Sequence, residues 1–397
     1  MKKLLLATTI LAGMTASAFA GGHEVKMGVI LGFTGPIESL TPDMAAAAEL
    51  AMKEASDSKM LLDGKVIVPV RGDSTCTDAA AATAAAERLI NSDGVVGIMG
   101  ADCSGVTTAI ANNVGVPNGV VMVSPSATSP ALSTIEDKGF FFRTAPSDAR
   151  QGQVLSDVLK DRGITSVAVT FTNNDYGKGL AAAFQEAFEA SGGKVVISAA
   201  HEDGKADYSA EVGALAAAGA EHLAVFGYVD QGGKGIIQTA LDTGAFENFI
   251  LADGMIGESL IEAIGEDLEG TIGTLPGSES DGAAKFKEVA TAGGLAKNDG
   301  PFMPESYDAA ALMILAMQAA GSTDRAAIQA KVMEVANEPG EKILPGELAK
   351  ALEILKNGGQ VDYEGASNVK LTDVGEAAGS YKELEVKDGK FATVKVR

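Results

Sequence analysis

The sequence predicts an α/β protein of two lobes, each built on a doubly wound parallel sheet. Short apolar runs rich in valine and isoleucine alternate with alanine-rich stretches long enough for crossover helices. This alternation is typical of parallel βαβ units. The alternation breaks near residues 143–146 and then resumes. Because the 397 residues exceed what one hydrophobic core normally serves, two lobes with a cleft between them are expected.

The first lobe is predicted from strands and helices that alternate along the first third of the chain. Its strand candidates are short, apolar and β-branched, as expected for strands buried on both faces. They occupy residues 25–30, 66–70, 95–99 and 120–123. Alanine-rich helices are expected between them, at residues 43–56, 77–90 and 104–113.

The second lobe and the tail follow the break. Buried strands are expected at residues 167–172, 195–198, 223–227 and 249–251. Two long amphipathic helices are predicted at 304–321 and 323–335. The last residues predict a hairpin, 381–386 with 391–396, around the turn Asp388-Gly389. Residues 357–379, rich in Gly, Asp, Asn and Ser, are expected to form a loop.

An export leader is predicted at residues 1–20. A basic start, Lys2-Lys3, precedes a mostly apolar stretch, and Ala18-Phe19-Ala20 supplies the small residues of a cleavage site. A membrane anchor is the alternative, but the apolar stretch is shorter than the roughly 20 residues that span a bilayer. We therefore expect cleavage before Gly21. Because no cysteine stands at the leader's end for lipid attachment, we expect a mature protein free in the periplasm.

The charge of the chain excludes two classes of partner. The formal net charge is −22, and without the leader 29 basic side chains face 53 acidic ones, which gives −24. Such a surface repels nucleic acid and anionic lipid. Neither is expected as a partner.

The two cysteines, Cys76 and Cys103, each stand in the loop after a predicted strand. In an oxidising compartment two cysteines pair by default. Two free buried thiols are the alternative.

Signatures of catalysis and of cofactor binding are missing from the sequence. His23, His201 and His222 have no metal-ligand spacing and are expected to be surface or capping residues. The glycine-rich stretch 28–35 lacks the spacing that admits a pyrophosphate and is interpreted as a tight turn facing the cleft. No P-loop or nucleophile elbow occurs. We expect no catalytic residue, no metal and no cofactor.

Polar loops follow the predicted strands, at the edge where open α/β sheets bind ligands. The first lobe contributes loops 102–105 and 124–130, and the second contributes 174–177, 228–230 and 252–254. Ser104 opens a helix, where it is either a plain N-cap or part of a carboxylate site. Thr128 is likewise either a turn residue or a ligand contact. The three acidic loops of the second lobe favour a cationic ligand group there.

These residues together resemble the branched-chain amino acid-binding proteins of bacterial ABC importers, which are type I periplasmic binding proteins. The resemblance runs over nearly the whole chain after the leader. The motifs that carry it are Cys76, Cys103-Ser104, Ser124-Pro125-Ser126-Ala127-Thr128, Asp175-Tyr176-Gly177-Lys178-Gly179 and Leu251-Ala252-Asp253-Gly254.

The resemblance implies a ligand site that includes Ala127 of the Ser-Pro-Ser-Ala-Thr loop. Ser104 and Thr128 would bind the ligand's α-carboxylate, while the Ser126 carbonyl and Asp253 would face its ammonium. The tyrosines would also be cleft residues: Tyr176 would close over the ligand, and Tyr228 matches another cleft tyrosine to within a residue or two. The disulfide would lie beside the site.

Two departures from that family concern the side-chain pocket. Leu40 stands where leucine-type binders have an aromatic residue, and Asp102 stands where they have an apolar one. Asp253 is also one methylene shorter than the family's usual glutamate. The resemblance therefore supports an α-amino acid or related small zwitterionic amine more firmly than leucine itself.

The resemblance also implies an organisation and a role. Three crossovers would join the lobes, with lobe 1 at 21–144 plus 277–355 and lobe 2 at 145–276 plus 356–397. The protein would be a monomer that captures its ligand by lobe closure and delivers it to an ABC permease in the inner membrane. A periplasmic sensory protein is the alternative. A secreted α/β hydrolase is a further one, although Ser104 has no histidine in a matching loop.

Overall fold

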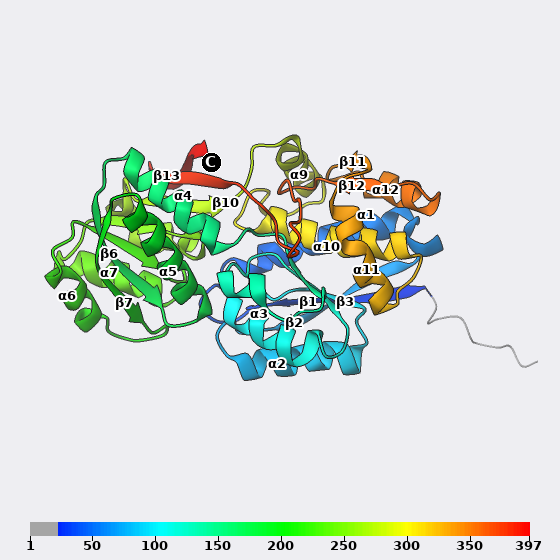
Figure 1. Ribbon diagram of the computed structural model, residues 1–397, viewed down its shortest axis with the longest axis horizontal. Coiled ribbons are helices and arrows are strands. Elements are labelled where there is room, and N and C mark those ends of the chain that lie inside the picture. Colours follow the sequence, from blue (N-terminus) through cyan, green and yellow to red (C-terminus); the bar gives the residue numbers. More distant parts are fainter. Residues whose placement is uncertain (1–22) are drawn as a thin grey trace, which may run out of the picture.

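The computed structural model describes residues 23–397, so the predicted leader and its cleavage site lie outside the described residues. Two separate sheets, each flanked by helices, form two lobes side by side (Figure 1). The α/β class and the two-lobe organisation predicted from the sequence are confirmed.

The first sheet is parallel and has the strand order β2-β1-β3-β4-β5. Its central strands are buried along nearly their whole length, which explains their uninterrupted apolar sequences. The strands are β1 (Glu24–Leu31), β2 (Val66–Asp73), β3 (Gly97–Gly100), β4 (Val121–Ser124) and β5 (Phe141–Arg143). Four of the five were predicted from the sequence; β5 was not.

Helices from both ends of the chain cover this sheet. The most buried of them is α10, a helix of alanine, leucine and methionine whose residues 303–318 are all buried except Pro304. A helix that is apolar all round belongs inside a core. The helices of this lobe are α1 (Thr41–Ser58), α2 (Ala79–Glu87), α3 (Ser104–Ile110), α9 (Asp281–Ala292), α10 (Met303–Ala320), α11 (Arg325–Ala336) and α12 (Leu348–Lys356).

The second sheet has the order β14-β13-β10-β9-β8-β6-β7. Its five parallel strands are β6 (Ser166–Thr172), β7 (Lys194–His201), β8 (His222–Phe226), β9 (Asn248–Leu251) and β10 (Ile272–Pro276). The predicted terminal hairpin, β13 (Tyr381–Lys387) and β14 (Lys390–Val396), adds an antiparallel edge beside β10. The helices are α4 (Asp148–Asp161), α5 (Asp175–Ala190), α6 (Ser209–Ala217), α7 (Gly232–Thr243) and α8 (Glu258–Ile264).

The chain passes between the lobes after β5, after β10 and before β13. Residues 357–379, expected as loop, contain a short strand, β12 (Val361–Tyr363), which pairs with β11 (Glu341–Ile343) of the first lobe. Asp308 of α10 also accepts hydrogen bonds from the backbone N–H groups of Ala366 and Ser367. We therefore propose that the third crossing lies near residue 380 and not after residue 355.

A disulfide joins Cys76 and Cys103 across the loops that follow β2 and β3. Both cysteines are buried, and the described residues contain no free cysteine. The predicted pairing is confirmed. The two cysteines are 27 residues apart in the sequence, so the bond restricts the unfolded chain as well as holding the two loops together.

We expect that reduction of this bond lowers the free energy of unfolding by about 3.5 kcal/mol, the loop-entropy value for a loop of this length. Urea unfolding of the oxidised protein and of the double variant Cys76→Ser/Cys103→Ser would measure the difference. The native oxidised protein should show no reactive thiol. Two titratable thiols before reduction would contradict the bond.

Candidate ligand-binding site

A cavity lies between the two lobes and is lined by residues of both. One part of its wall is polar and the other apolar. The polar part consists of Asp102, Ser104, Ser126, Tyr176, Tyr228 and Asp253. The apolar part consists of Ile37, Leu40, Met44 and Phe302. Cys103 and Gly254 complete the lining. Six of the eight predicted site residues thus line one cavity. Ala127 and Thr128, which follow Ser126 in the sequence, are buried but do not line the cavity.

The loop after β4 supplies the first lobe's polar contacts, and Ser124 shapes it. The Ser124 hydroxyl accepts a hydrogen bond from the Ala127 N–H at 2.9 Å. Ser104, at the start of α3, accepts a hydrogen bond from the Ser129 N–H at 3.1 Å. Because the Ser104 hydroxyl acts here only as an acceptor, its hydrogen is available to a ligand in the cavity.

Arg143, at the end of β5, holds the loop after β4 in place through its guanidinium group. Its Nη1 donates to the carbonyl oxygens of Ala127 and Ser129 at 3.0 and 2.9 Å, and its Nη2 donates to Glu376. The Arg143 side chain is only 1% exposed. The Ala127 carbonyl therefore points toward the guanidinium. From the sequence, Arg143 was expected only to lie in a break of the alternation; the signal for its role is a lone basic residue at the end of an apolar strand.

Asp102 lines the cavity, but both of its carboxylate oxygens are already engaged. Oδ2 accepts from the Gly32 N–H at 2.6 Å, and Oδ1 accepts from Ser74 at 3.0 Å and from the Cys103 N–H at 2.9 Å. Burial raises the pKa of Asp102, and these hydrogen bonds oppose that rise. Asp102 therefore ties the glycine-rich turn after β1 to the disulfide loops.

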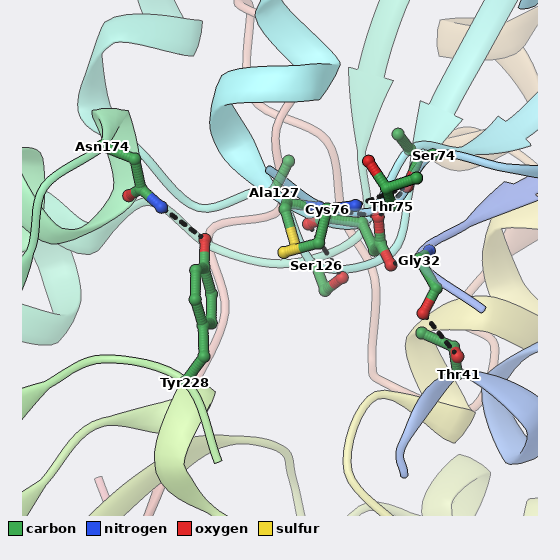
Figure 2. The surroundings of a disulfide bond; sticks show 12 residues. Gly32, Thr41, Ser74, Thr75, Cys76, Ser126, Ala127, Asn174 and Tyr228 are labelled. Carbon is green, nitrogen blue, oxygen red and sulfur yellow. Dashed lines mark hydrogen bonds between the residues drawn. A yellow bond between two sulfur atoms is a disulfide. The ribbon is translucent and has the colours of Figure 1, made fainter. Parts of the chain in front are cut away.

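Figure 2 shows the disulfide beside Ser126 and Ala127, with the Tyr228 ring approaching from the second lobe. Asn174 donates to the Tyr228 hydroxyl at 3.3 Å and also accepts from the Gly177 N–H, which caps α5. The rings of Tyr176 and Tyr228 stack with their centroids 5.3 Å apart. The two tyrosines form one aromatic wall of the cavity.

Asp253, in the loop after β9, is the acid of the second lobe. Its Oδ1 accepts from the Tyr176 hydroxyl at 2.6 Å and from the Gly254 N–H at 2.8 Å. Its Oδ2 is buried and has no hydrogen-bond partner among the described residues. Burial raises the pKa of Asp253 to about 6, while the bonds from Tyr176 and Gly254 hold it down. At neutral pH an ionised oxygen therefore stays unpaired beside the cavity.

The apolar side of the cavity was only partly visible in the sequence. Leu40 was expected there, whereas Ile37, Met44 and Phe302 were not. Phe302 precedes α10 with φ of 57°, a backbone conformation uncommon for a bulky side chain. It reaches the cavity from a segment more than 250 residues after Leu40, so no local sequence pattern marks it.

The comparisons with known proteins agree with this geometry. A family model described as periplasmic binding protein matches residues 24–347. The chain belongs to the periplasmic binding protein family. A Leu/Ile/Val-binding protein homolog 3 from Brucella melitensis biotype 1 is 30% identical over 342 residues, with 84% of this chain and 89% of that protein covered.

Solved structures resemble this periplasmic binding protein over most of its length. The leucine-binding protein LivK of Thermotoga maritima gives a TM-score of 0.79 at 25% identity, covering 94% of this chain and 98% of its own. LivJ of Streptococcus pneumoniae, solved with isoleucine, gives 0.77 at 21% identity, covering 94% and 99%. The type I fold predicted from the sequence is confirmed by these likenesses.

The lobes of this periplasmic binding protein touch at the cavity's rim. Asp230 of the second lobe accepts from the Ser39 N–H at 2.9 Å and from Ser259 at 2.8 Å, and its own N–H donates to the Pro36 carbonyl at 3.0 Å. On another side, a Cβ at Gly179 would lie 2.8 Å from Pro130 of the first lobe. The two lobes are thus in direct contact, and at Gly179 a larger side chain would not fit without a shift of Pro130.

Metal-binding groups, membrane-spanning helices and the histidines can be compared with the expectations from the sequence within residues 23–397. These residues contain no group of three or more His, Cys, Asp or Glu side chains placed to hold a metal ion. None of their helices is long and apolar enough to cross a membrane. The expectation of surface or capping histidines is wrong for His201, which is buried with its Nδ1 2.9 Å from the Thr170 hydroxyl.

We expect Asp102→Leu to destabilise the protein and not simply to broaden its ligand range. The change leaves three buried donors unpaired, and each such donor costs roughly 1–3 kcal/mol. Urea unfolding should show a loss of at least about 3 kcal/mol. Asp57→Leu, at a position whose side chain is 65% exposed, is the control. A loss no greater than the control's, with affinity for apolar ligands gained, would show that Asp102 acts on specificity alone.

Proposed function

We propose that this periplasmic binding protein captures an α-amino acid with an apolar side chain. The observation that carries the proposal is the unpaired Oδ2 of Asp253, buried beside a cavity whose far wall offers hydroxyl donors. A buried ionised oxygen without a partner costs free energy. A ligand ammonium at that oxygen would remove the cost.

The other end of the zwitterion would meet the first lobe. Ser104 has its hydroxyl hydrogen available, and the buried Thr128 hydroxyl has no partner among the described residues. Hydroxyls that donate to a carboxylate make strong, charge-assisted bonds. The Ser126 carbonyl, in the same loop, is the acceptor we assign to the ammonium beside Asp253.

The ligand's side chain would lie against the apolar wall. The apolar wall offers no side-chain hydrogen-bonding group: it consists of Ile37, Leu40, Met44 and Phe302. Asp102, which lines the same cavity, is already engaged within the protein. A polar side chain would lose its hydration there without replacement. The names of the Leu/Ile/Val-binding relatives point to the same ligand class.

Closure would couple binding to delivery. The proposed ligand contacts come from both lobes, so a bound ligand stabilises the closed form over the open one. We propose that the protein acts as a monomer, is exported through leader 1–20 and presents its closed form to an ABC permease. We propose further that it returns its ligand unchanged: the Ser104 hydroxyl has no histidine partner among the described residues.

Asp253→Asn should weaken L-leucine binding at least tenfold, because losing one charge of a buried, hydrogen-bonded pair costs roughly 2–5 kcal/mol. Calorimetry at neutral pH would measure this. Asp242→Asn, a change at an exposed acid of the same lobe, should leave affinity unchanged. Equal affinity in Asp253→Asn and in the parent would rule out an ammonium at this carboxylate.

The raised pKa of Asp253 predicts the direction in which ligand affinity and folding stability change with pH. Because only the ionised carboxylate attracts an ammonium, the parent's affinity for its ligand should fall as the pH drops through the Asp253 pKa of about 6.

The stability of the ligand-free protein should change with pH in the opposite direction. Since the folded pKa exceeds the unfolded value of 3.8, the folded state binds more protons, and this group's contribution to stability falls as the pH rises from about 4 to about 6. Thermal unfolding of Asp253→Asn without ligand should lack that fall.

A further inference from the structure

The segment of residues 36–40, between β1 and α1, brings part of the cavity's apolar wall into contact with the second lobe. It contains Ile37 and Leu40, which line the cavity. Asp230, in the loop after β8, contacts the backbone of this segment but does not line the cavity itself. From the sequence, the loop of Asp230 was expected to favour a cationic ligand group. The structure instead places Asp230 against the first lobe.

The contact consists of two hydrogen bonds that run in opposite directions between the lobes. Asp230 Oδ2 accepts from the Ser39 N–H at 2.9 Å. The Asp230 N–H donates to the Pro36 carbonyl at 3.0 Å. Among the described residues, neither of these two backbone groups of the first lobe has another hydrogen-bond partner. Because both bonds join one lobe to the other, both are broken if the lobes separate.

Asp230 is held in position by its own lobe. Its second oxygen, Oδ1, accepts from the hydroxyl of Ser259, near the start of α8, at 2.8 Å. The hydroxyl oxygens of Ser259 and Ser39 lie 3.1 Å apart, so the three residues form one hydrogen-bonded cluster across the lobes. A carboxylate that is already oriented loses less side-chain freedom when the contact forms.

The packing on this side of the cavity is close, and its other polar contact is exposed. A Cβ at Gly257, just before α8, would lie 3.2 Å from Leu40 Cδ2. Lys297, between α9 and α10, pairs with Glu258 of α8 at 2.9 Å, but the Glu258 side chain is 72% exposed. An exposed ion pair contributes little free energy. The half-buried Asp230 bonds are therefore the stronger polar contact here.

We propose that Asp230 keeps the lobes together around a bound ligand by holding residues 36–40 against the second lobe. Asp230 is a positioning residue, because it acts through this segment and touches no ligand. It sets the rate at which the ligand leaves, whereas the residues that line the cavity determine which ligand is accepted. This role rests on the proposed function, because it needs a ligand that is held between the lobes.

The test measures association and dissociation separately, with L-leucine as the probe. The contact forms only when the lobes come together, so its loss should act on dissociation. Asp230→Ala should release leucine about tenfold faster than the parent, because a hydrogen bond to a charged group contributes about that factor. The association rate constant should stay within about twofold of the parent's. Stopped-flow fluorescence can follow both rates through the stacked tyrosines of the cavity, since the chain has no tryptophan.

Ligand choice separates this role from a direct ligand contact. Because Asp230 touches no ligand, L-isoleucine and L-valine should lose affinity in Asp230→Ala by the same factor as leucine. Thermal unfolding of ligand-free Asp230→Ala should match that of the parent, because the contact acts when a ligand holds the lobes together. A change in that unfolding temperature as large as the change with ligand would show a merely structural role and overturn the proposal.

Two further variants provide a rescue and a matched control. The asparagine of Asp230→Asn can still accept from the Ser39 N–H and can donate to the Ser259 hydroxyl. This variant should release leucine within about threefold of the parent. Glu258→Ala removes an acid that also faces the first lobe, but one from an exposed ion pair. It should leave the dissociation rate unchanged at an ionic strength of about 0.15 M.

Ser259→Ala covers the case in which Asp230→Ala fails to fold. It removes the donor that orients the Asp230 carboxylate and should speed release by about threefold. In that case an unchanged release rate in Ser259→Ala would overturn the proposal.

The remaining outcomes are distinct from those for the proposed function. An unchanged dissociation rate in a folded Asp230→Ala would overturn the proposal, as would a loss confined to association or one that differs among the three ligands. None of these results changes the outcome for Asp253→Asn, so the proposed function would stand. If the parent itself does not bind leucine, the proposed function fails and the role of Asp230 fails with it.

Discussion

The unpaired carboxylate oxygen of Asp253 is the constraint around which the rest of the site is organised. A charge in so buried a place reduces the stability of the empty protein. Tyr176 and the Gly254 N–H stabilise one oxygen, while the other has no hydrogen-bond partner among the described residues. The tyrosine that holds Asp253 also stacks on Tyr228, so the electrostatic and the aromatic parts of the second lobe form one unit.

In the first lobe, the backbone of the loops that line the site is held in place by fixed contacts. Arg143 holds two carbonyls of the loop after β4, and the disulfide fixes the loops after β2 and β3. Rigidity here reduces the ordering that binding must impose, which favours affinity. Both Arg143 and Asp148 flank the first crossing between the lobes. Both therefore border the segment through which the chain passes from the first lobe to the second.

Much of this arrangement could be predicted from the sequence. The strands of both sheets are continuous apolar runs, and the site residues follow them directly, so periodicity and the strand-end rule locate the site. What escaped prediction depends on distant partners. Arg143 pairs with Glu376, 233 residues away, and Asp102 accepts from Gly32, 70 residues away. Phe302 likewise reaches the cavity from a part of the chain far from Ile37, Leu40 and Met44. Such contacts leave no periodic signal in a single sequence.

The central claim is that the site recognises both charged ends of an apolar amino acid. Calorimetry with L-leucine, 4-methylpentanoate and 3-methylbutylamine tests it most directly, because the second compound lacks the ammonium and the third lacks the carboxylate. The account predicts that leucine binds and that each analogue binds at least tenfold more weakly, since each leaves one set of buried polar groups unpaired. Binding of 4-methylpentanoate as tight as that of leucine would contradict it.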